Sequence, residues 1–234
     1  MLTKRFVPQA DVVGSIVLNN SVGGLNPYAL KTSLGFGCKM VWMPTVSALH
    51  HYEHYREKGH PMGLSTDPGL KLTIFSGQTE NLLPEVVEIL RLIAQHNIML
   101  ATGHLSPREV VLLVDAAREE EVKSILITHP SDSLTGMSLE DQVALARKGA
   151  YLEHTLLSMM PLWHSNTLEE VIESIRKAGV EHTVLTTDFG QVHHPPPAEG
   201  LRIYGQMLIE KGFTKDQVRT MIVDNPRKLL GLQR

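Results

Sequence analysis

The chain alternates between short apolar runs and longer stretches in which apolar residues recur every three or four positions. The short runs are rich in branched residues, which indicates buried strands. The longer stretches have the spacing of helices that bury one face. Continuous apolar strands that alternate with such helices predict a parallel sheet covered by helices, an α/β fold. The expected strands are 12–18, 38–46, 98–103, 124–128, 150–155 and 183–187, and the expected helices are 82–96, 107–121, 139–148, 168–178, 198–212 and 215–223.

Six strands leave two architectures open. A closed (β/α) TIM-like barrel needs eight strands and about 250 residues, whereas an open doubly wound sheet is complete with five or six strands. The 234 residues fit a single domain over 1–234. Within it, the stretch at about 47–82 contains no clear helix–strand unit, and loops of this length are usually lids or binding loops. We therefore expect one domain with a long insertion loop.

The composition of the chain limits the kinds of molecule that we expect it to bind. The chain has 22 basic and 25 acidic side chains, a net charge of −3, which argues against a dedicated nucleic-acid binder. No apolar run approaches the roughly 18 residues that a membrane span needs, and no secretion signal is visible near the start. The single cysteine, Cys38, cannot form an internal disulfide, which suits a reducing compartment. We expect a cytoplasmic protein that acts on a small-molecule substrate.

Twelve histidines exceed what packing requires, and several follow expected strands. The ends of four successive strands carry His104, His129, the pair Glu153-His154, and Asp188. The carboxyl ends of parallel strands form the ligand-binding face of such folds, so these side chains would share one rim. Neutral imidazoles and a carboxylate suit Zn²⁺ or a similar divalent ion, whose bound water ionises near neutral pH. The pattern predicts a metal site made of His104, His129 and Asp188.

Each of these residues also has an ordinary structural explanation. A single histidine at a strand end often bonds only a backbone carbonyl, but the two strand-end histidines together with Asp188 favour a site. Along one strand, Glu153 and His154 point in opposite directions. We place Glu153 inward, as a substrate contact or as a member of a plain salt bridge. His193 follows Asp188 on the same rim, as a substrate contact or as part of a rigid polar loop.

A second histidine cluster lies inside the expected insertion loop. His50 and His54 would share one helix face at the spacing of helical zinc pairs, with His51 beside them. The glutamate of the zincin motif His-Glu-x-x-His is absent from its place. A solvated, partly helical loop is therefore the favoured interpretation.

Four short segments carry a family likeness: 101–104 (Ala-Thr-Gly-His), 127–130 (Ile-Thr-His-Pro), 185–188 (Leu-Thr-Thr-Asp) and 224–231 (Asp-Asn-Pro-Arg-Lys-Leu-Leu-Gly). They resemble the amidohydrolase superfamily of metal-dependent hydrolases. Val-Gly-Gly-Leu-Asn-Pro at 22–27 and Trp-Met-Pro-Thr at 42–45 resemble an uncharacterised amidohydrolase-like family. The resemblance extends over about 12–232 and implies a distorted eight-stranded barrel. It makes His104 the fifth-strand ligand, His129 the sixth-strand histidine, and Asp188 the eighth-strand aspartate that orients or deprotonates the attacking water.

The chain departs from that superfamily at its start. No His-x-His pair precedes residue 12, and the stretch 38–46 offers neither a lysine nor a carboxylate in the bridging position. Counted back from Asp188, the first two strand–helix units are absent. We therefore expect an incomplete barrel of about six βα units that holds one ion, Zn²⁺ first, with Mn²⁺ or Fe²⁺ as alternatives. A shortened chain, a second subunit or a local rearrangement would each explain the gap, as would replacement ligands from His50, His51 or His54.

The leading hypothesis is a metal-dependent hydrolase that uses metal-activated water to attack a C–N or C–O bond of a small polar substrate. Asp188 would bind metal or act as base, and His129 would bind metal or stabilise the developing oxyanion. One rival is a catalytically silent barrel that binds a ligand or a partner. Another is a metal-free enzyme with His129 as base, assisted by Asp188 or Glu153. Exposed strand edges would favour a homo-oligomer.

Overall fold

One parallel sheet organises the chain. The structure, a computed structural model, describes residues 11–57, 59–60, 71–77 and 81–232. The order of the six strands in the sheet is their order in the chain, and every neighbouring pair is parallel. A doubly wound sheet would change direction at a switch point, so this sequential order is that of a barrel. The strands are β1 (Gly14–Val17), β2 (Cys38–Trp42), β3 (Met99–Ala101), β4 (Ser124–Ile127), β5 (Tyr151–Thr155) and β6 (Thr183–Thr186).

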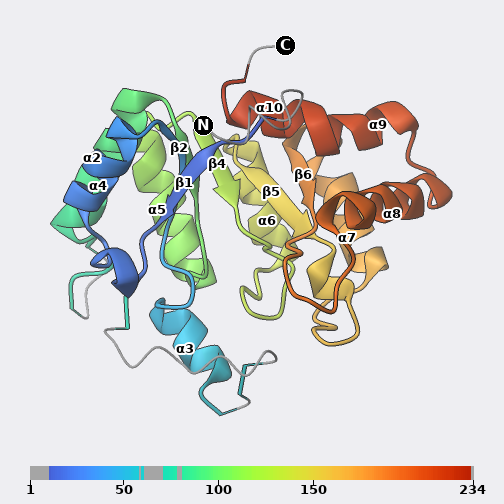
Figure 1. Cartoon of the computed structure of the whole chain (residues 1–234), viewed down its shortest axis with the longest axis horizontal. Helices are drawn as coiled ribbons and strands as arrows, with labels where there is room; N and C mark the ends of the chain where they lie inside the picture. The colour runs from blue at the N-terminus through green and yellow to red at the C-terminus, as the bar shows by residue number, and fades with distance from the viewer. Residues whose placement is uncertain (1–10, 58, 61–70, 78–80, 233–234) are drawn as a thin grey trace.

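The sheet does not close into a full barrel. Within the part of the chain that the structure describes, β1 and β6 are its two edges and do not pair with each other. All six strands expected from the sequence are present, and helices alternate with them (Figure 1). The fold is therefore an incomplete (β/α) TIM-like barrel with six strands.

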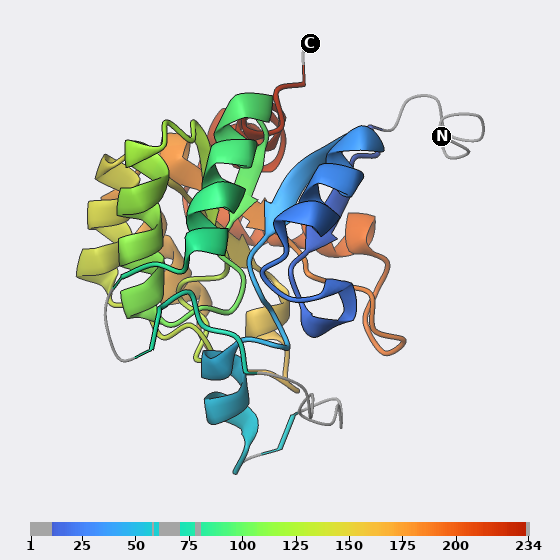
Figure 2. The same ribbon diagram turned by 90° about the vertical axis from the view of Figure 1, so that its left-hand side faces the viewer.

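Helices cover the outer side of this sheet. Figure 2 shows α2, α4 and α5 side by side in one layer, while α3 stands apart below the carboxyl ends of the strands. None of the helices within the described ranges is long and apolar enough to cross a membrane. The helices are α2 (Pro27–Gly35), α3 (Leu49–Tyr55), α4 (Pro84–His96), α5 (Pro107–Glu119), α6 (Leu139–Arg147), α7 (Leu168–Ala178), α8 (Pro197–Glu210), α9 (Lys215–Arg219) and α10 (Asn225–Leu229).

A capping interaction at α5 also ties down the insertion loop. Ser106 caps the helix by accepting from the backbone N–H of Glu109, and the Glu109 carboxylate accepts in return from the backbone N–H of Ser106. The same carboxylate accepts from the hydroxyl of Thr73 at 2.6 Å and from the backbone N–H of Ile74 at 3.1 Å. Buried Glu109 therefore holds residues 73–74, near the end of the loop, against the first turn of α5.

The two faces of the sheet have different neighbours. In β2, Val41 belongs to the apolar core between the sheet and helices α2, α4 and α5. Its neighbours Met40 and Trp42 point to the inner face, where they pack with Val184 and with Leu229 of α10. Successive strand residues point to opposite sides, so this alternation defines an inside and an outside for every strand.

Gly103 allows β3 to end close to the chain that follows β2. Its φ is +60°, and the hydroxyl of Thr128 accepts from its backbone N–H at 3.0 Å. The next residue, His104, donates its backbone N–H to the carbonyl oxygen of Pro44 at 3.0 Å. A residue without a side chain is needed here because the backbone of residues 43–44 lies against its α-carbon.

The alternation along β5 separates two adjacent polar residues. Glu153 faces inward, where its Oε1 accepts from the hydroxyl of Thr186 at 3.0 Å. His154 faces the helices, with its Nδ1 3.5 Å from the hydroxyl of Ser131. Within the described residues, its Nε2 is buried without a hydrogen-bond partner. Burial lowers the pKa of His154 from 6.5 to about 4, so the ring is neutral in the folded chain at neutral pH.

Replacing Gly103 with alanine should destabilise the fold. The new Cβ would lie 2.5 Å from the carbonyl oxygen of Met43 and 2.6 Å from that of Pro44. We expect the free energy of unfolding, measured in urea, to fall by about 2–4 kcal/mol. The matched control is Gly35→Ala at the end of α2, where a Cβ meets nothing within 4 Å. Its stability should stay the same or rise by up to about 1 kcal/mol, and equal stabilities of the two variants would contradict this account.

His154 should make the fold sensitive to acid. Between pH 6.5 and 4 the unfolded chain binds a proton at His154 and the folded chain does not, so its stabilising contribution is present above pH 6.5 and is lost as pH falls towards 4. We expect a loss of up to about 1.4 kcal/mol per pH unit in that window. Urea denaturation between pH 7 and pH 4 should show this loss reduced in His154→Gln. The exposed-site control His96→Gln should follow the unmodified chain, and an unchanged pH slope in His154→Gln would disprove the assignment.

Candidate active site

A cavity of about 460 Å³ lies at the carboxyl ends of the strands. In Figure 1 this end of the sheet faces α3, opposite the end where α10 lies. Residues at or just after the ends of all six strands, and His51 of α3, meet at this cavity, although they are scattered along the chain from Val17 to Gln191. The titratable groups that line it include His51, His104, His129, Glu153 and Asp188.

His104 and His51 form a buried pair at this cavity. Their Nδ1 atoms lie 2.8 Å apart, and the rings stack with centroids 4.9 Å apart. Burial lowers the pKa of His51 to about 4, and burial together with the neighbouring His129 holds the pKa of His104 well below its usual value. Both rings are therefore neutral near pH 7, and one ring nitrogen donates to the other. Neutral imidazole is also the form that binds metal ions.

His51 belongs to the site, although the sequence favoured a solvated loop for its segment. That interpretation is wrong for His51, which is 4% exposed. Neighbouring His50 points elsewhere, because its Nε2 lies 2.7 Å from the carbonyl oxygen of Leu134. The sequence allowed His50, His51 or His54 to supply a replacement ligand at the strand ends. Of His50 and His51, it is His51 that lines the cavity.

His129 and Asp188 both follow their strands in unusual backbone conformations. Their φ values are +27° and +54°, in the left-handed region that side-chain-bearing residues rarely adopt. Asn97, Glu121 and His164 share this conformation elsewhere in the described chain, and at the strand ends it is found at His129 and Asp188. The His129 ring lies 5.1 Å from the His104 ring, centroid to centroid, and its Nδ1 is 3.1 Å from the hydroxyl of Thr135.

Two carboxyl groups complete the polar wall: Glu153 is buried, and Asp188 lines the cavity from an exposed position. Burial and the nearby charge of Asp188 together raise the pKa of Glu153 to about 7, against the opposing effect of its hydrogen bonds from Thr186 and from the backbone of His129. Burial also raises the pKa of Asp188, while the ring of His129 opposes this shift. Carboxyl groups that titrate closer to neutral pH can both accept and give protons during a reaction.

His193 lies outside this set. It is exposed, and its ring contacts that of His194 with centroids 4.4 Å apart. Gln191 lines the cavity from the same segment instead. The substrate contact expected of His193 stays a prediction, and Gln191 is the residue of this loop that the structure places at the cavity wall.

The cavity offers the right ligand types for a divalent ion: two or three neutral imidazoles and a carboxylate. Two donor atoms already converge, the Nδ1 atoms of His51 and His104. Among the described residues, however, no three His, Cys, Asp or Glu side chains form a group arranged to hold a metal. The residues fit such an ion by chemistry, and a complete set of ligands requires His104 to exchange its bond with His51.

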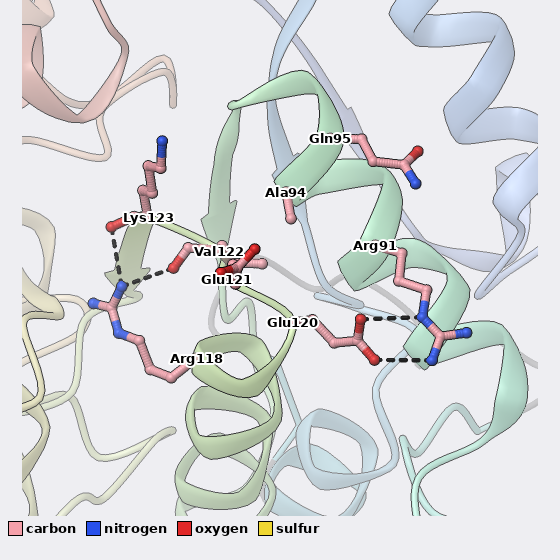
Figure 3. A pocket seen from close by; sticks show the side chains of 8 residues that line it. All are labelled: Arg91, Ala94, Gln95, Arg118, Glu120, Glu121, Val122 and Lys123. Atoms are coloured by element: carbon pink, nitrogen blue, oxygen red, sulfur yellow. Dashed lines mark hydrogen bonds and ion pairs between the residues drawn. The ribbon is translucent and has the colours of Figure 1, made fainter.

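Another cavity, of about 750 Å³, lies between the end of α4 and the residues that precede β4. Figure 3 shows two of its arginines in hydrogen bonds, one with a carboxylate and one with backbone carbonyl groups. Arg91 donates to both carboxylate oxygens of Glu120 at 3.0 Å, and Arg118 donates to the carbonyl oxygens of Val122 and Lys123. These interactions precede β4 and therefore lie at the amino ends of the strands. Because parallel barrels place their chemistry at the carboxyl ends, we assign these interactions to the stability of the fold.

Solved structures confirm the fold. A metallo peptidase from Rhodobacter sphaeroides, liganded with a phosphinate mimic of the dipeptide L-Ala-D-Ala, matches 95% of this chain and 63% of its own, with a TM-score of 0.63 and 14% identity. An amidohydrolase from Pseudomonas aeruginosa matches 88% of this chain and 67% of its own, with a TM-score of 0.62 and 12% identity. The phosphotriesterase homology protein from Escherichia coli, complexed with phosphate in its active site, matches 97% and 87%, with a TM-score of 0.52 and 14% identity.

These likenesses confirm the resemblance to the amidohydrolase superfamily at the level of fold. This chain spans about 63% of the metallo peptidase's length, less than two thirds. No curated protein matches the sequence. A family model matches residues 1–153, which include β1 to β4, His104 and His129. The chain belongs to this family, a family of unknown function designated DUF6282.

Proposed function

We propose that the chain is a metal-dependent hydrolase of amidohydrolase type, which uses water to cleave a C–N or C–O bond of a small polar substrate. The observation that carries this proposal is the meeting of neutral His51 and His104 with His129, Glu153 and Asp188 around one cavity at the carboxyl ends of the strands. This is the position at which parallel barrels place their chemistry. The structural neighbours support it, because they include metallo peptidases and an amidohydrolase.

Asp188 is the base in this proposal. Its pKa is raised above that of a free aspartate and so lies closer to neutral pH. Asp188 can therefore take a proton from the attacking water. Glu153, whose pKa is about 7, is part protonated near neutral pH and can give a proton to the leaving group. As the alternative to binding metal, His129 can accept from Thr135 at Nδ1 and donate from Nε2 to the developing oxyanion.

The cofactor is part of the same proposal. His104, His129 and Asp188 would hold one divalent ion, Zn²⁺ first with Mn²⁺ or Fe²⁺ as alternatives, and such an ion lowers the pKa of a bound water to about 7. His104 would exchange its hydrogen bond with His51 for the ion. His51, whose ring stacks on that of His104 with centroids 4.9 Å apart, would then be a positioning residue that holds the His104 ring in place.

A second candidate is a barrel that binds a ligand without turning it over. One observation favours it: the described residues contain no complete three-ligand group. The two candidates differ in metal uptake, which can be measured without knowledge of the substrate.

Metal uptake should depend on His104. Protein purified without an affinity tag and treated with a chelator should bind about one Zn²⁺ per chain, measured by calorimetry and by elemental mass spectrometry. His104→Ala should weaken binding by more than about tenfold, since loss of an outer partner alone costs that much. The matched control His50→Ala, whose ring faces Leu134, should bind as the unmodified chain does. A folded chain that takes up no added metal would refute metal dependence and favour the binding protein.

Hydrolysis should depend on Asp188. With Zn²⁺ present and 4-nitrophenyl acetate as probe, Asp188→Asn should lower kcat/KM by about 100-fold or more, because the amide cannot accept the proton of the attacking water. The control is Asp216→Asn on the exposed side of α9, which should keep full activity. Equal rates in Asp188→Asn and the unmodified chain would remove Asp188 from the reaction.

A further inference from the structure

A second cavity, of about 440 Å³, occupies the inner face of the open sheet. It lies among the inward-facing side chains of β2, β3, β4 and β6, and helices α8 and α10 form its opposite wall. Most of the strand side chains around it are buried, whereas Pro197 and Ala198 at the start of α8 are exposed, so the cavity is half open to solvent. The apolar residues around it include Met40, Met99, Leu126, Val184, Leu201 and Leu229.

The incomplete sheet explains why this space is open. In a closed barrel, layers of inward side chains from eight strands fill the interior. Here six strands supply the inner face, and Leu229 of α10 and Leu201 of α8 cover only part of it. Protein interiors are close-packed, and voids larger than a few water molecules are rare. A space of this size inside an apolar shell is therefore suited to a ligand.

The two cavities adjoin one another. Trp42, Glu153 and Thr186 line both of them. Glu153 is therefore at the boundary: its carboxyl group faces the histidines on one side and the apolar shell on the other. A molecule whose reacting group lies beside Asp188 can extend past Glu153 into the inner cavity.

The lining decides which chemical group fits. Glu153 is the single ionisable side chain among the described residues of the inner cavity, and Thr186 and Thr187 add hydroxyl groups near the same end. Beyond them the wall is made of methionine, leucine, valine, proline and tryptophan side chains. Such a wall gives no partner to a charge or to an amide, whose burial without hydrogen bonds is costly. A hydrocarbon group gains by leaving water for this wall.

We infer that the inner cavity binds an apolar tail of the substrate whose polar, hydrolysable group lies at the histidine and carboxylate site. The substrate class is thus an ester, amide or related compound with an unbranched hydrocarbon chain of several carbons. The identification of the bound molecule as a substrate rests on the proposed function, whereas the binding of a hydrocarbon group in the inner cavity does not depend on it. A second copy of the chain is the other conceivable cover for the cavity, and the experiment below distinguishes it.

Neutral alcohols test the binding without any hydrolysis. Trp42 lines both cavities, so its fluorescence in a Trp163→Phe background should report occupation of the inner one. Affinity should rise about threefold or more for each methylene added from 1-butanol to 1-octanol, since a buried methylene contributes about 0.8 kcal/mol. Leu201→Gln should weaken 1-octanol binding more than about tenfold. Ile203→Gln, on an exposed site of the same helix, is the matched control and should bind normally.

A parallel series of 4-nitrophenyl esters separates the two proposals. From acetate to octanoate, KM should fall with chain length in the unmodified chain and in Ile203→Gln, and stay flat in Leu201→Gln. Alcohol binding without hydrolysis of any ester would keep the apolar site and count against the hydrolase. Hydrolysis of the acetate with no gain for longer esters and no alcohol binding would overturn the inference. Absence of alcohol binding in a chain that sediments as a dimer would also overturn it, in favour of a second copy as the cover.

Discussion

The parallel register of the strands is the constraint on which the site depends. Ala101 of β3 pairs with Leu126 of β4, so His104 and His129 each follow this pair by three residues. Leu126 also pairs with Tyr151 at the start of β5, so β5 extends past the end of β4 and carries Glu153 to the level of the rim. Whatever follows each strand therefore meets its neighbours without long connecting segments. Gly103 makes this possible at β3, because a side chain there would collide with the backbone after β2. The rim is thus a consequence of strand pairing, and the functional side chains need only occupy the right position after each strand.

Sequence pattern could predict the elements because periodicity is local. Buried parallel strands are apolar runs wherever they occur, and residues such as Ser106 and Glu109 start a helix through bonds within one turn. The choice between a barrel and a doubly wound sheet was not local. It depends on which strands are neighbours, and that order follows from pairing across the sheet. The family resemblance, rather than periodicity, pointed to the barrel.

The candidate site shows the same division. Glu153 could be placed inward because residues alternate along a strand, and its neighbour His154 outward for the same reason. His51 could not be placed, because its position depends on how α3 packs under the strand ends, and no local rule relates that helix to His104. His193 was chosen for its nearness in sequence to Asp188. The left-handed conformation at Asp188 redirects the chain, and distance along the sequence then ceases to indicate distance in space.

Glu153 is where the fold and the proposed chemistry make opposing demands. Burial of a carboxyl group between an apolar cavity and a second acid destabilises its ionised form, as its pKa of about 7 shows. A purely structural position would be served by an uncharged residue, which would hold the same hydrogen bond from Thr186 without this penalty. A carboxyl group retained at the junction of a polar and an apolar cavity, and poised to exchange its proton near neutral pH, is explained by a reaction at one end of a molecule whose other end avoids water.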